Sequence, residues 1–353
     1  MSMSTILVDL YSDTLTKPTK EMRRFMCDAE VGDEQKGEDP TVNLLQDMVT
    51  ELLGKESALF LPSGTMCNEI AIKVHCRPGD EVLLDKTAHP LNSEGGAPAV
   101  LSGVMVRGLD GARGVFAAEQ LRGAIRPISR YQPRTHLVSV EQTSNLGGGT
   151  VWPLETIKAV CRTAQECQLA THMDGARLFN AVVASGVSAK NFAESFDSVW
   201  IDLSKGLGAP VGAVLAGSRD FIAEAWRWKQ RLGGAMRQAG IIAAGGVYAL
   251  KHHIERLAED HANARILAQK LAQIPGLSVS PQDVETNIVL VDVSQTGLSA
   301  MQFSDRLLSQ GLRMSVVGPC RLRAVTHLDV SKGDIDKALE IVNRVVKELR
   351  IPG

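Results

Sequence analysis

The chain has 353 residues, of which 44% are apolar and 22% are charged, and its formal net charge is −2 at pH 7. This composition is typical of a globular protein with two or three domains, and the near-neutral charge argues against binding of nucleic acid or anionic membranes. No run of about 18 apolar residues occurs, and the N-terminal sequence lacks a basic segment before an apolar core, so neither a membrane span nor a secretory signal is predicted.

Short apolar runs alternate with helix-like segments through residues 1–248. Residues 49–64 read as a helix end, a short strand and a turn, and residues 63–76 have helical spacing, with Met66, Ile70 and Val74 on one face. This alternation predicts a mostly parallel sheet covered by helices on both faces. The other predicted elements are strands at 81–85, 99–109, 135–143, 169–174, 198–204 and 212–217, and a helix at 153–168.

The pattern changes near residue 245. Residues 251–274 read as one long amphipathic helix, and strands follow at 287–294, 313–318 and 320–327 before a closing helix at 334–350. We therefore expect a large domain at 1–248 and a smaller α+β domain at 249–353, packed together without a low-complexity linker.

Four chemically distinctive features lie where parallel strands end. Asp174 closes one apolar strand, and Lys205 follows another about one strand–helix–strand unit later. The sequence Ser-Gly-Thr at 63–65 opens a helix, whose free N–H groups favour a phosphate, and His89 follows the 81–85 strand. Since ligands of parallel sheets bind at the carboxyl ends of strands, these features are expected at one edge.

Pyridoxal phosphate is the cofactor that uses all four features. A lysine amine forms a Schiff base with it, a carboxylate pairs with its ring nitrogen, and a helix N-terminus holds its phosphate. Taken singly, each residue has a simpler explanation: Asp174 as a turn aspartate, Lys205 as a solvated lysine, and His89 as a structural histidine. The conjunction, in this order and between these strands, favours the cofactor site.

Several long motifs resemble the threonine aldolase family of pyridoxal-phosphate lyases. They include LYSDTLTKPT at 10–19, VGDEQKGEDPT at 31–41, LFLPSGTMCNEIA at 59–71, HMDGARLFNA at 172–181 and LSKGLGAPVG at 203–212. The resemblance runs nearly end to end. It implies the aspartate-aminotransferase-like fold, fold type I, and cleavage of the Cα–Cβ bond of β-hydroxy-α-amino acids such as L-threonine or L-allo-threonine to glycine and an aldehyde.

The resemblance also implies roles for individual residues. Lys205 would carry the Schiff base, Asp174 would bond the ring nitrogen, and His89 would stack on the ring and assist proton transfer. Gly64 and Thr65 would bind the phosphate, with Ser204 nearby and Arg237 reaching it from a neighbouring subunit. The substrate carboxylate would be held by Ser12, Arg177 and Arg323, because an arginine fork binds a carboxylate bidentately.

Five positions depart from the pattern of many family members. Lys36 stands in place of a tyrosine, Tyr131 in place of a histidine, and Gln230 in place of a basic residue; Gln142 and Ser144 lie in EQTSN where Glu-Asn-Thr-His-Asn is common. The resemblance implies that Lys36 and Tyr131 would lie where the substrate side chain is read. We expect altered side-chain or threo/allo preference, with Tyr131 as hydroxyl partner or weak base; neutral drift is the alternative.

Other functions stay open at this stage. A racemase, transaldolase or β-eliminating lyase would use the same cofactor. A nicotinamide oxidoreductase is disfavoured because GLGAPVG at 206–212 has its third glycine one place late for the dinucleotide motif. A non-catalytic binding protein is disfavoured because Lys205, Asp174 and His89 are all present. The six cysteines form no C-x-x-C pair, so we expect reduced thiols, a cytoplasmic location and no metal site. The resemblance further implies a homotetramer, a dimer of dimers.

Overall fold

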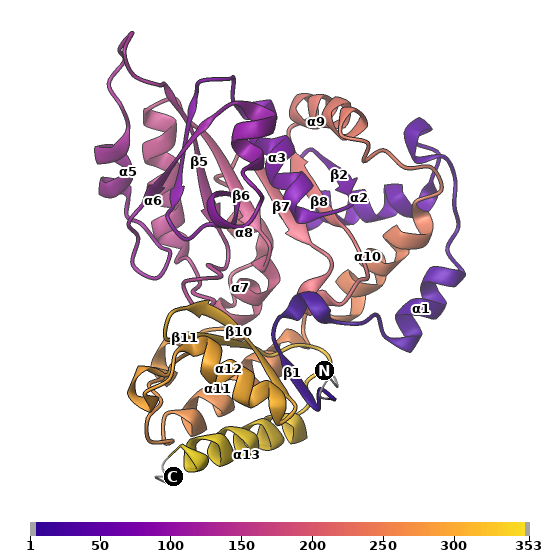
Figure 1. Ribbon diagram of the computed structural model, residues 1–353. Helices are drawn as coiled ribbons and strands as arrows, with labels where there is room; N and C mark the ends of the chain where they lie inside the picture. The colour runs from indigo at the N-terminus through magenta and orange to yellow at the C-terminus, as the bar shows by residue number, and fades with distance from the viewer. Residues whose placement is uncertain (1–4, 350–353) are drawn as a thin grey trace.

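The computed structural model describes residues 5–349, and a seven-stranded sheet forms its centre (Figure 1). Its strand order is β2-β8-β7-β6-β5-β3-β4. The run from β4 to β7 is parallel, whereas β8 pairs antiparallel with both β7 and β2. The expected mostly parallel α/β fold is confirmed. The strands are β2 (Ser57–Leu61), β3 (Glu81–Asp85), β4 (Met105–Leu109), β5 (Thr135–Glu141), β6 (Ala170–Gly175), β7 (Ser198–Asp202) and β8 (Ala213–Gly217).

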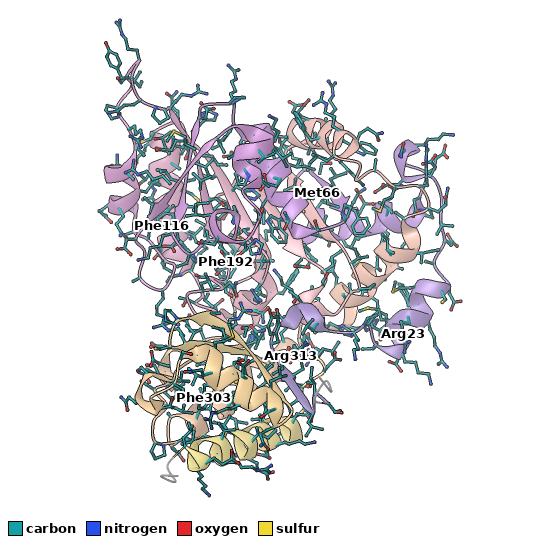
Figure 2. The ribbon with its side chains drawn as sticks, in the orientation of Figure 1. Arg23, Met66, Phe116, Phe192, Phe303 and Arg313 are labelled. Carbon is teal, nitrogen blue, oxygen red and sulfur yellow. The ribbon has the colours of Figure 1, made fainter. Side chains whose placement is uncertain are left out.

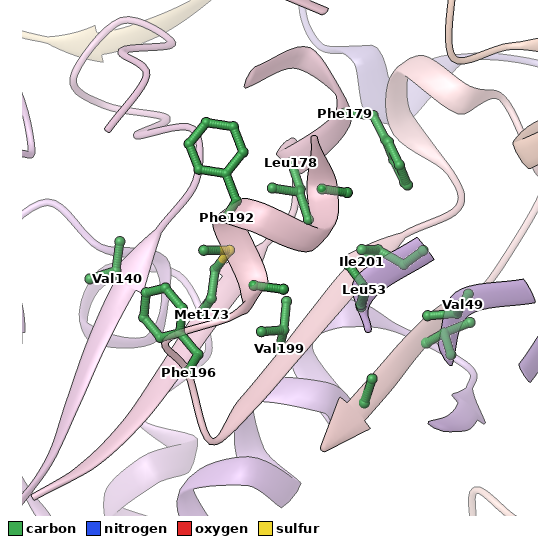
Figure 3. Packing of buried hydrophobic residues seen from close by; sticks show 14 of the residues in the cluster. Val49, Leu53, Val140, Met173, Leu178, Phe179, Phe192, Phe196, Val199 and Ile201 are labelled. Carbon is green, nitrogen blue, oxygen red and sulfur yellow. The ribbon is translucent and has the colours of Figure 1, made fainter. Parts of the chain in front are cut away.

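Successive residues of these strands point to opposite faces of the sheet and pack into two different hydrophobic cores. Phe60 and Val199 pack into one core, where Met173 meets Phe192 and Phe196 (Figure 3). The neighbouring residues of the same strands, such as Trp200, pack into a second core on the opposite face. A strand buried on both sides needs apolar residues at nearly every position, which explains the continuous apolar runs in the sequence.

Helices on the two faces complete these cores. Helices α2, α6, α7, α8 and α10 supply side chains to the first core, and α3 and α9 supply them to the second. Their bounds, with those of the other helices of this unit, are α1 (Lys20–Cys27), α2 (Pro40–Leu53), α3 (Gly64–His75), α4 (His89–Asn92), α5 (Ala118–Ala124), α6 (Leu154–Glu166), α7 (Leu178–Ser185), α8 (Ala189–Ala193), α9 (Arg219–Arg231) and α10 (Gly240–His252).

A second unit has its own sheet and its own core. The strand order is β1-β10-β11-β9, and Phe303 is buried here as Phe116 is in the larger unit (Figure 2). The elements are β1 (Val8–Leu10), α11 (Leu257–Leu271), β9 (Ile288–Asp292), α12 (Ala300–Ser309), β10 (Leu312–Gly318), β11 (Arg321–Val325) and α13 (Lys332–Glu348). The N-terminal strand β1 thus joins the smaller sheet. Helix α10 continues past residue 248, where the sequence places the boundary between the two domains. That boundary stays a prediction.

Two predicted elements differ from the observed ones. The helix expected at 251–274 is interrupted after α10, where His253 bonds the carbonyl of Leu207 through Nδ1 at 2.6 Å, and α11 starts at Leu257. The strand expected at 99–109 begins only at Met105, because Pro98–Ser102 form a helical turn that ends at Gly103 with a φ of +67°. Arg350, the last residue of the predicted closing helix, and residues 1–4 lie outside the described part of the chain.

No helix within residues 5–349 has the length and apolar character needed to cross a membrane. All six cysteines are free thiols.

Candidate active site

A cavity of about 410 Å³ opens at the carboxyl ends of β5, β6 and β7. These strands are parallel, so the residues that end them converge on one edge of the sheet. The N-terminal segment and β11 of the smaller unit close the other side. The cavity wall includes eight of the residues predicted from the sequence: Ser12, Gly64, Thr65, His89, Asp174, Arg177, Lys205 and Arg323.

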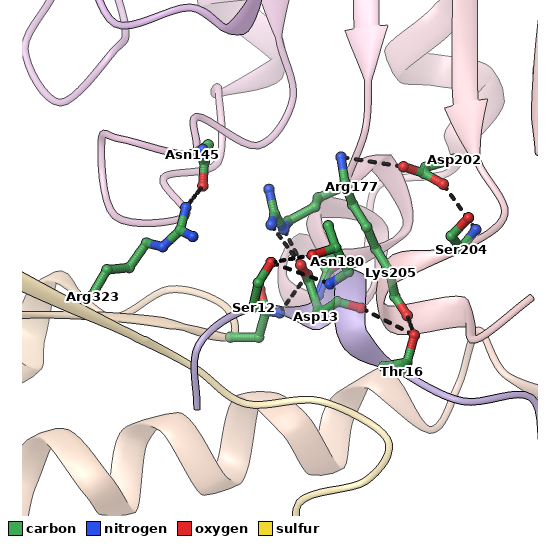
Figure 4. A network of polar contacts seen from close by, with 12 residues as sticks. Ser12, Asp13, Thr16, Asn145, Arg177, Asn180, Asp202, Ser204, Lys205 and Arg323 are labelled. Atoms are coloured by element: carbon green, nitrogen blue, oxygen red, sulfur yellow. Dashed lines mark hydrogen bonds and ion pairs between the residues drawn. The ribbon is translucent and has the colours of Figure 1, made fainter. Parts of the chain in front are cut away.

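Lys205 occupies a helical turn, η4 (Lys205–Leu207), directly after β7. Its backbone has a φ of +43°, a left-handed conformation that is uncommon for residues other than glycine and is concentrated at functional sites. The turn is held in place by Thr16, whose hydroxyl donates to the Lys205 carbonyl at 2.7 Å (Figure 4). The Nζ lies 3.2 Å from Oδ2 of Asp202, and the side chain is 17% exposed. Ser204 lines a small neighbouring pocket rather than the main cavity.

Asp174 is buried at the end of β6. Its Oδ1 accepts from the N–H of Ala176 at 3.0 Å, and its Oδ2 accepts from Nδ2 of Asn68 at 2.8 Å. Burial raises the pKa of this carboxyl, and the charge of Lys205 and the Asn68 bond oppose that shift. The negative charge of the ionised Asp174 carboxylate would stabilise a cationic group of a ligand placed beside it.

His89 begins the short helix α4 and faces the cavity with part of its ring. Its Nδ1 lies 2.7 Å from Oε1 of Glu94, and its backbone N–H donates to Glu141 at 2.9 Å. The hydrogen bond to Glu94 raises the pKa of the imidazole above its usual value, against the effect of burial. A carboxylate only accepts, so Nδ1 of His89 carries the hydrogen of this bond, and in the neutral imidazole Nε2 keeps its lone pair.

Helix α3 points its N-terminus at the cavity. Ser63 caps it by accepting from the N–H of Met66, and the first-turn N–H groups of Gly64 and Thr65 have no intrahelical acceptor. An added Cβ at Gly64 would lie 2.3 Å from the ring of Trp200, so only glycine permits this close approach. The end of α3 therefore has the donors and the dipole that bind a phosphate.

The two predicted carboxylate-binding arginines differ in their partners. Arg177 is buried and bonds Asp13 through Nε at 2.8 Å and Nη2 at 2.7 Å. In the described chain Arg323 bonds only neutral groups, Asn145 through Nη1 at 2.6 Å (Figure 4) and Ser315 through Nε at 3.1 Å. No ion pair of Arg323 occurs among residues 5–349, so a substrate carboxylate would be its first anionic partner.

Three predicted site residues lie away from the cavity in this single chain. Tyr131 is 88% exposed in the segment between α5 and β5. Lys36 is exposed in a helical turn, η2 (Glu34–Lys36), and Arg237 is exposed and pairs with Asp33 at 2.8 Å. Their roles stay predictions.

Sequence reasoning missed acidic and amide residues of the same wall. Glu141 ends β5 opposite Asp174 in the parallel register, and the rule applied to Asp174 would have identified it. Burial and the charge of Asp174 raise the pKa of Glu141 to about 7. Glu94 of the wall carries no comparable signal, and neither do Asp13 and Asn68, which bond Arg177 and Asp174 without lining the cavity, since all three positions depend on tertiary contacts.

The residues present fit pyridoxal phosphate. The phosphate-binding helix end, the buried Asp174 carboxylate and the Lys205 amine border one cavity, and each offers the chemistry that one part of this cofactor requires. Among residues 5–349, no three His, Cys, Asp or Glu side chains are grouped to hold a metal ion.

Comparison with known proteins gives consistent matches. The family described as Beta-eliminating lyase matches residues 9–294. A Low specificity L-threonine aldolase of Escherichia coli is 43% identical over 327 residues, covering 92% of this chain and 95% of its own length. The Low-specificity L-threonine aldolase 1 of Arabidopsis thaliana is 37% identical and covers 98% of both chains. Among solved structures, a Leishmania major threonine aldolase superposes with a TM-score of 0.83 at 20% identity, covering 96% of this chain and 99% of that one.

Proposed function

This chain belongs to the beta-eliminating lyase family, and from that premise we propose that it is a pyridoxal-phosphate-dependent aldolase. It cleaves the Cα–Cβ bond of L-threonine-type and L-allo-threonine-type β-hydroxy-α-amino acids, reversibly, to glycine and an aldehyde. The observation that carries this proposal is the convergence of Lys205, Asp174 and Arg323 on one cavity at the carboxyl edge of the sheet.

The cofactor would be held by groups from three elements. Lys205 would form the covalent link through Nζ, Asp174 would pair with the ring nitrogen, and the N–H groups of Gly64 and Thr65 would receive the phosphate. When bound, pyridoxal phosphate supplies an electron-accepting ring that stabilises negative charge at the Cα of an attached amino acid.

The protein orients the substrate and moves its protons. Arg323 binds the substrate carboxylate, assisted by Ser12 and Arg177, and this contact fixes which bond at Cα is aligned for cleavage. The Nε2 lone pair of His89 accepts the β-hydroxyl proton, because Glu94 occupies the Nδ1 side. The Cα–Cβ bond then breaks, the aldehyde leaves, and a proton is returned to Cα to give glycine.

Product identification tests this function. We expect the purified protein to have a visible chromophore that borohydride reduction removes, and to release glycine and acetaldehyde from L-threonine or L-allo-threonine. Lys205→Ala should lack both the chromophore and the activity. A D-amino acid product would instead indicate a racemase, and ammonia with a keto acid would indicate a β-eliminating lyase; a colourless protein after cofactor addition would contradict the proposal.

Substrate preference is a finer part of the proposal. Tyr131 and Lys36 replace residues common in the family, and we propose that they read the substrate side chain and shift the threo/allo preference. Tyr131→Phe removes only the hydroxyl, so it should change the ratio of activities on L-threonine and L-allo-threonine. An unchanged activity and ratio would exclude Tyr131 as hydroxyl partner or base.

We also propose a homotetramer, a dimer of dimers, in the cytoplasm. The exposure of Tyr131, Lys36 and Arg237 outside the cavity supports an assembly in which these residues act in a partner's site. The free thiols are those expected in a reducing compartment.

A further inference from the structure

Two buried carboxyl groups, one in the cavity wall and one outside it, leave three oxygen atoms without partners among residues 5–349. Glu69 is on α3 and is 3% exposed, and neither of its oxygens has a hydrogen-bond partner in the described part of the chain. Glu94 has a fully buried side chain; its Oε1 is bonded, but its Oε2 has no partner. An unsatisfied buried carboxylate oxygen is costly, so these atoms require an explanation.

A single proton provides one. No cation pairs with Glu69 among residues 5–349, so Glu69 and the neighbouring Glu94, whose Oε1 faces His89, cannot both stay ionised away from water. When Glu69 is protonated, its hydroxyl can donate to Oε2 of Glu94, and this bond gives a partner to two of the three oxygens. Consistently, burial first and the contact with Glu94 second raise the pKa of Glu69 to about 9.

Glu94 connects this pair to the reacting groups. Its Oε1 accepts from Nδ1 of His89 at 2.7 Å and from Nδ2 of Asn68 at 2.8 Å. The same Asn68 amide donates to Asp174. Through Glu94 the pair also interacts with three other ionisable groups, which are His89, Asp174 and the buried thiol of Cys67. Glu69 itself does not line the cavity, whereas Glu94 does.

We propose that Glu69 is a positioning residue that keeps a shared proton on the Glu69–Glu94 pair and thereby fixes Glu94 against Nδ1 of His89. The role rests on the proposed function, because it presents Nε2 of His89 to the β-hydroxyl of the substrate. Loss of the shared proton sets two negative charges side by side, displaces the Glu94 carboxylate, and leaves the imidazole without a fixed tautomer.

Thermal unfolding of the holoenzyme as a function of pH tests whether the Glu69–Glu94 pair holds a proton, independently of any reaction. The folded state holds this proton up to about pH 9, whereas the unfolded chain releases it near the ordinary glutamate pKa of 4.5. The wild-type Tm should therefore fall as pH rises through this window. Glu69→Gln cannot release a proton and its amide can still donate to Glu94, so its Tm should fall less steeply. Parallel curves for the two proteins would overturn the shared proton.

The pH profile of kcat tests the positioning role. The wild type should lose kcat near pH 9, and Glu69→Gln should retain it to higher pH. Glu69→Leu fills the site without a donor, so its kcat should be about tenfold lower at every pH, with little change in KM. If Glu69→Gln flattens the Tm curve but keeps the wild-type kcat profile, the proton is structural only and the positioning role is wrong.

Glu51→Gln is the matched control, because Glu51 is an exposed glutamate of α2 that makes no ion pair in the described chain. Both of its pH curves should coincide with those of the wild type. A failure of the proposed function would be recognised separately, by the absence of glycine and aldehyde among the products.

Discussion

At the scale of single residues, Arg177 and Arg323 carry the same charge into the cavity but are not equivalent. Asp13 already binds two nitrogens of Arg177, so that arginine is largely committed to the fold. Arg323 has only neutral partners, and burial lowers the pKa of its guanidinium. A guanidinium with no anion beside it is better prepared to receive a carboxylate.

Arg323→Ala should therefore reduce kcat/KM for L-threonine about 100-fold, in line with the loss of a charge-assisted contact to the substrate. Steady-state kinetics measure this, and the loss should be smaller for the same substrate as its methyl ester.

Arg321→Ala provides a control on the same strand. Arg321 is two residues away on β11, is exposed, and lines a different cavity. Its removal should leave kcat/KM within about twofold of the wild type, as expected for a surface charge. Equal losses in the two variants would mean that Arg323 acts through general charge and not through contact.

The strand-end rule explains which site residues the sequence could predict. Asp174 and Lys205 follow apolar strands directly, so hydrophobic patterning alone places them at one sheet edge. Asn68 and Glu94 lie inside or beside helices, and the patterning of those helices gives no indication that they face the site. The position of Asp13 depends on the pairing of β1 with β10 of the smaller sheet. This pairing is a long-range contact that the local sequence pattern does not encode.

At the scale of secondary structure elements, the entry of α3 is tightly constrained. Gly64 lies against Trp200 of β7, and a Cβ there would come within 2.3 Å of the indole ring. Gly64→Ala should therefore shift the helix end or the indole and weaken phosphate binding, although alanine favours helix. We expect about a tenfold or greater rise in the dissociation constant for pyridoxal phosphate, measured by absorbance titration.

Gly123→Ala serves as the control for this helix effect. Gly123 lies inside α5, and a Cβ there would meet nothing within 4 Å. This variant should be stabilised by up to about 1 kcal/mol with unchanged cofactor affinity. If Gly64→Ala also left the affinity unchanged, the contact with Trp200 would not control the phosphate site.

The interruption between α10 and α11 could not be predicted from the hydrophobic periodicity of the sequence. The apolar pattern continues across residues 251–274, yet helix α10 ends at His252. The next residue, His253, bonds the carbonyl of Leu207 in the turn that contains Lys205. A tertiary hydrogen bond to the loop that contains Lys205 thus overrides local helix propensity. The parallel strands were predictable because two buried faces demand continuous apolar runs, a constraint that is local in sequence.

At the scale of the whole molecule, Asp13 ties three parts of the chain together. It bonds Arg177 of the larger unit, Asn287 of the smaller unit donates to it at 3.1 Å, and it lies in the N-terminal segment. Burial would raise the pKa of this carboxyl, but Arg177 holds it well below its usual range. The stability that it contributes is thus present above about pH 4 and lost as pH falls further.

Asp13→Asn leaves the Arg177 charge buried without its anion, so it should destabilise the protein by about 3 to 5 kcal/mol and reduce the loss of Tm between pH 5 and pH 3. Asp9→Asn is the matched control, since the Asp9–Arg313 pair is partly exposed and should contribute less than about 1 kcal/mol. Similar changes in Tm for both variants would contradict a special role for Asp13.

The proposed assembly predicts that two inactive variants can restore activity when they associate in one oligomer. If Arg237 acts in a partner's site, a hybrid of Lys205→Ala and Arg237→Ala chains contains one site with both residues intact. Each variant alone should be inactive or weak, and unfolding and refolding an equal mixture should recover up to about a quarter of wild-type activity.

Mixing Lys205→Ala with Arg323→Ala is the control for this complementation. Both residues line the same cavity of one chain, so every site in those hybrids carries one of the two defects. This mixture should recover nothing. Recovery in neither mixture, with hybrid formation confirmed by mass spectrometry, would place Arg237 outside the shared site and restrict the site to the residues of one chain.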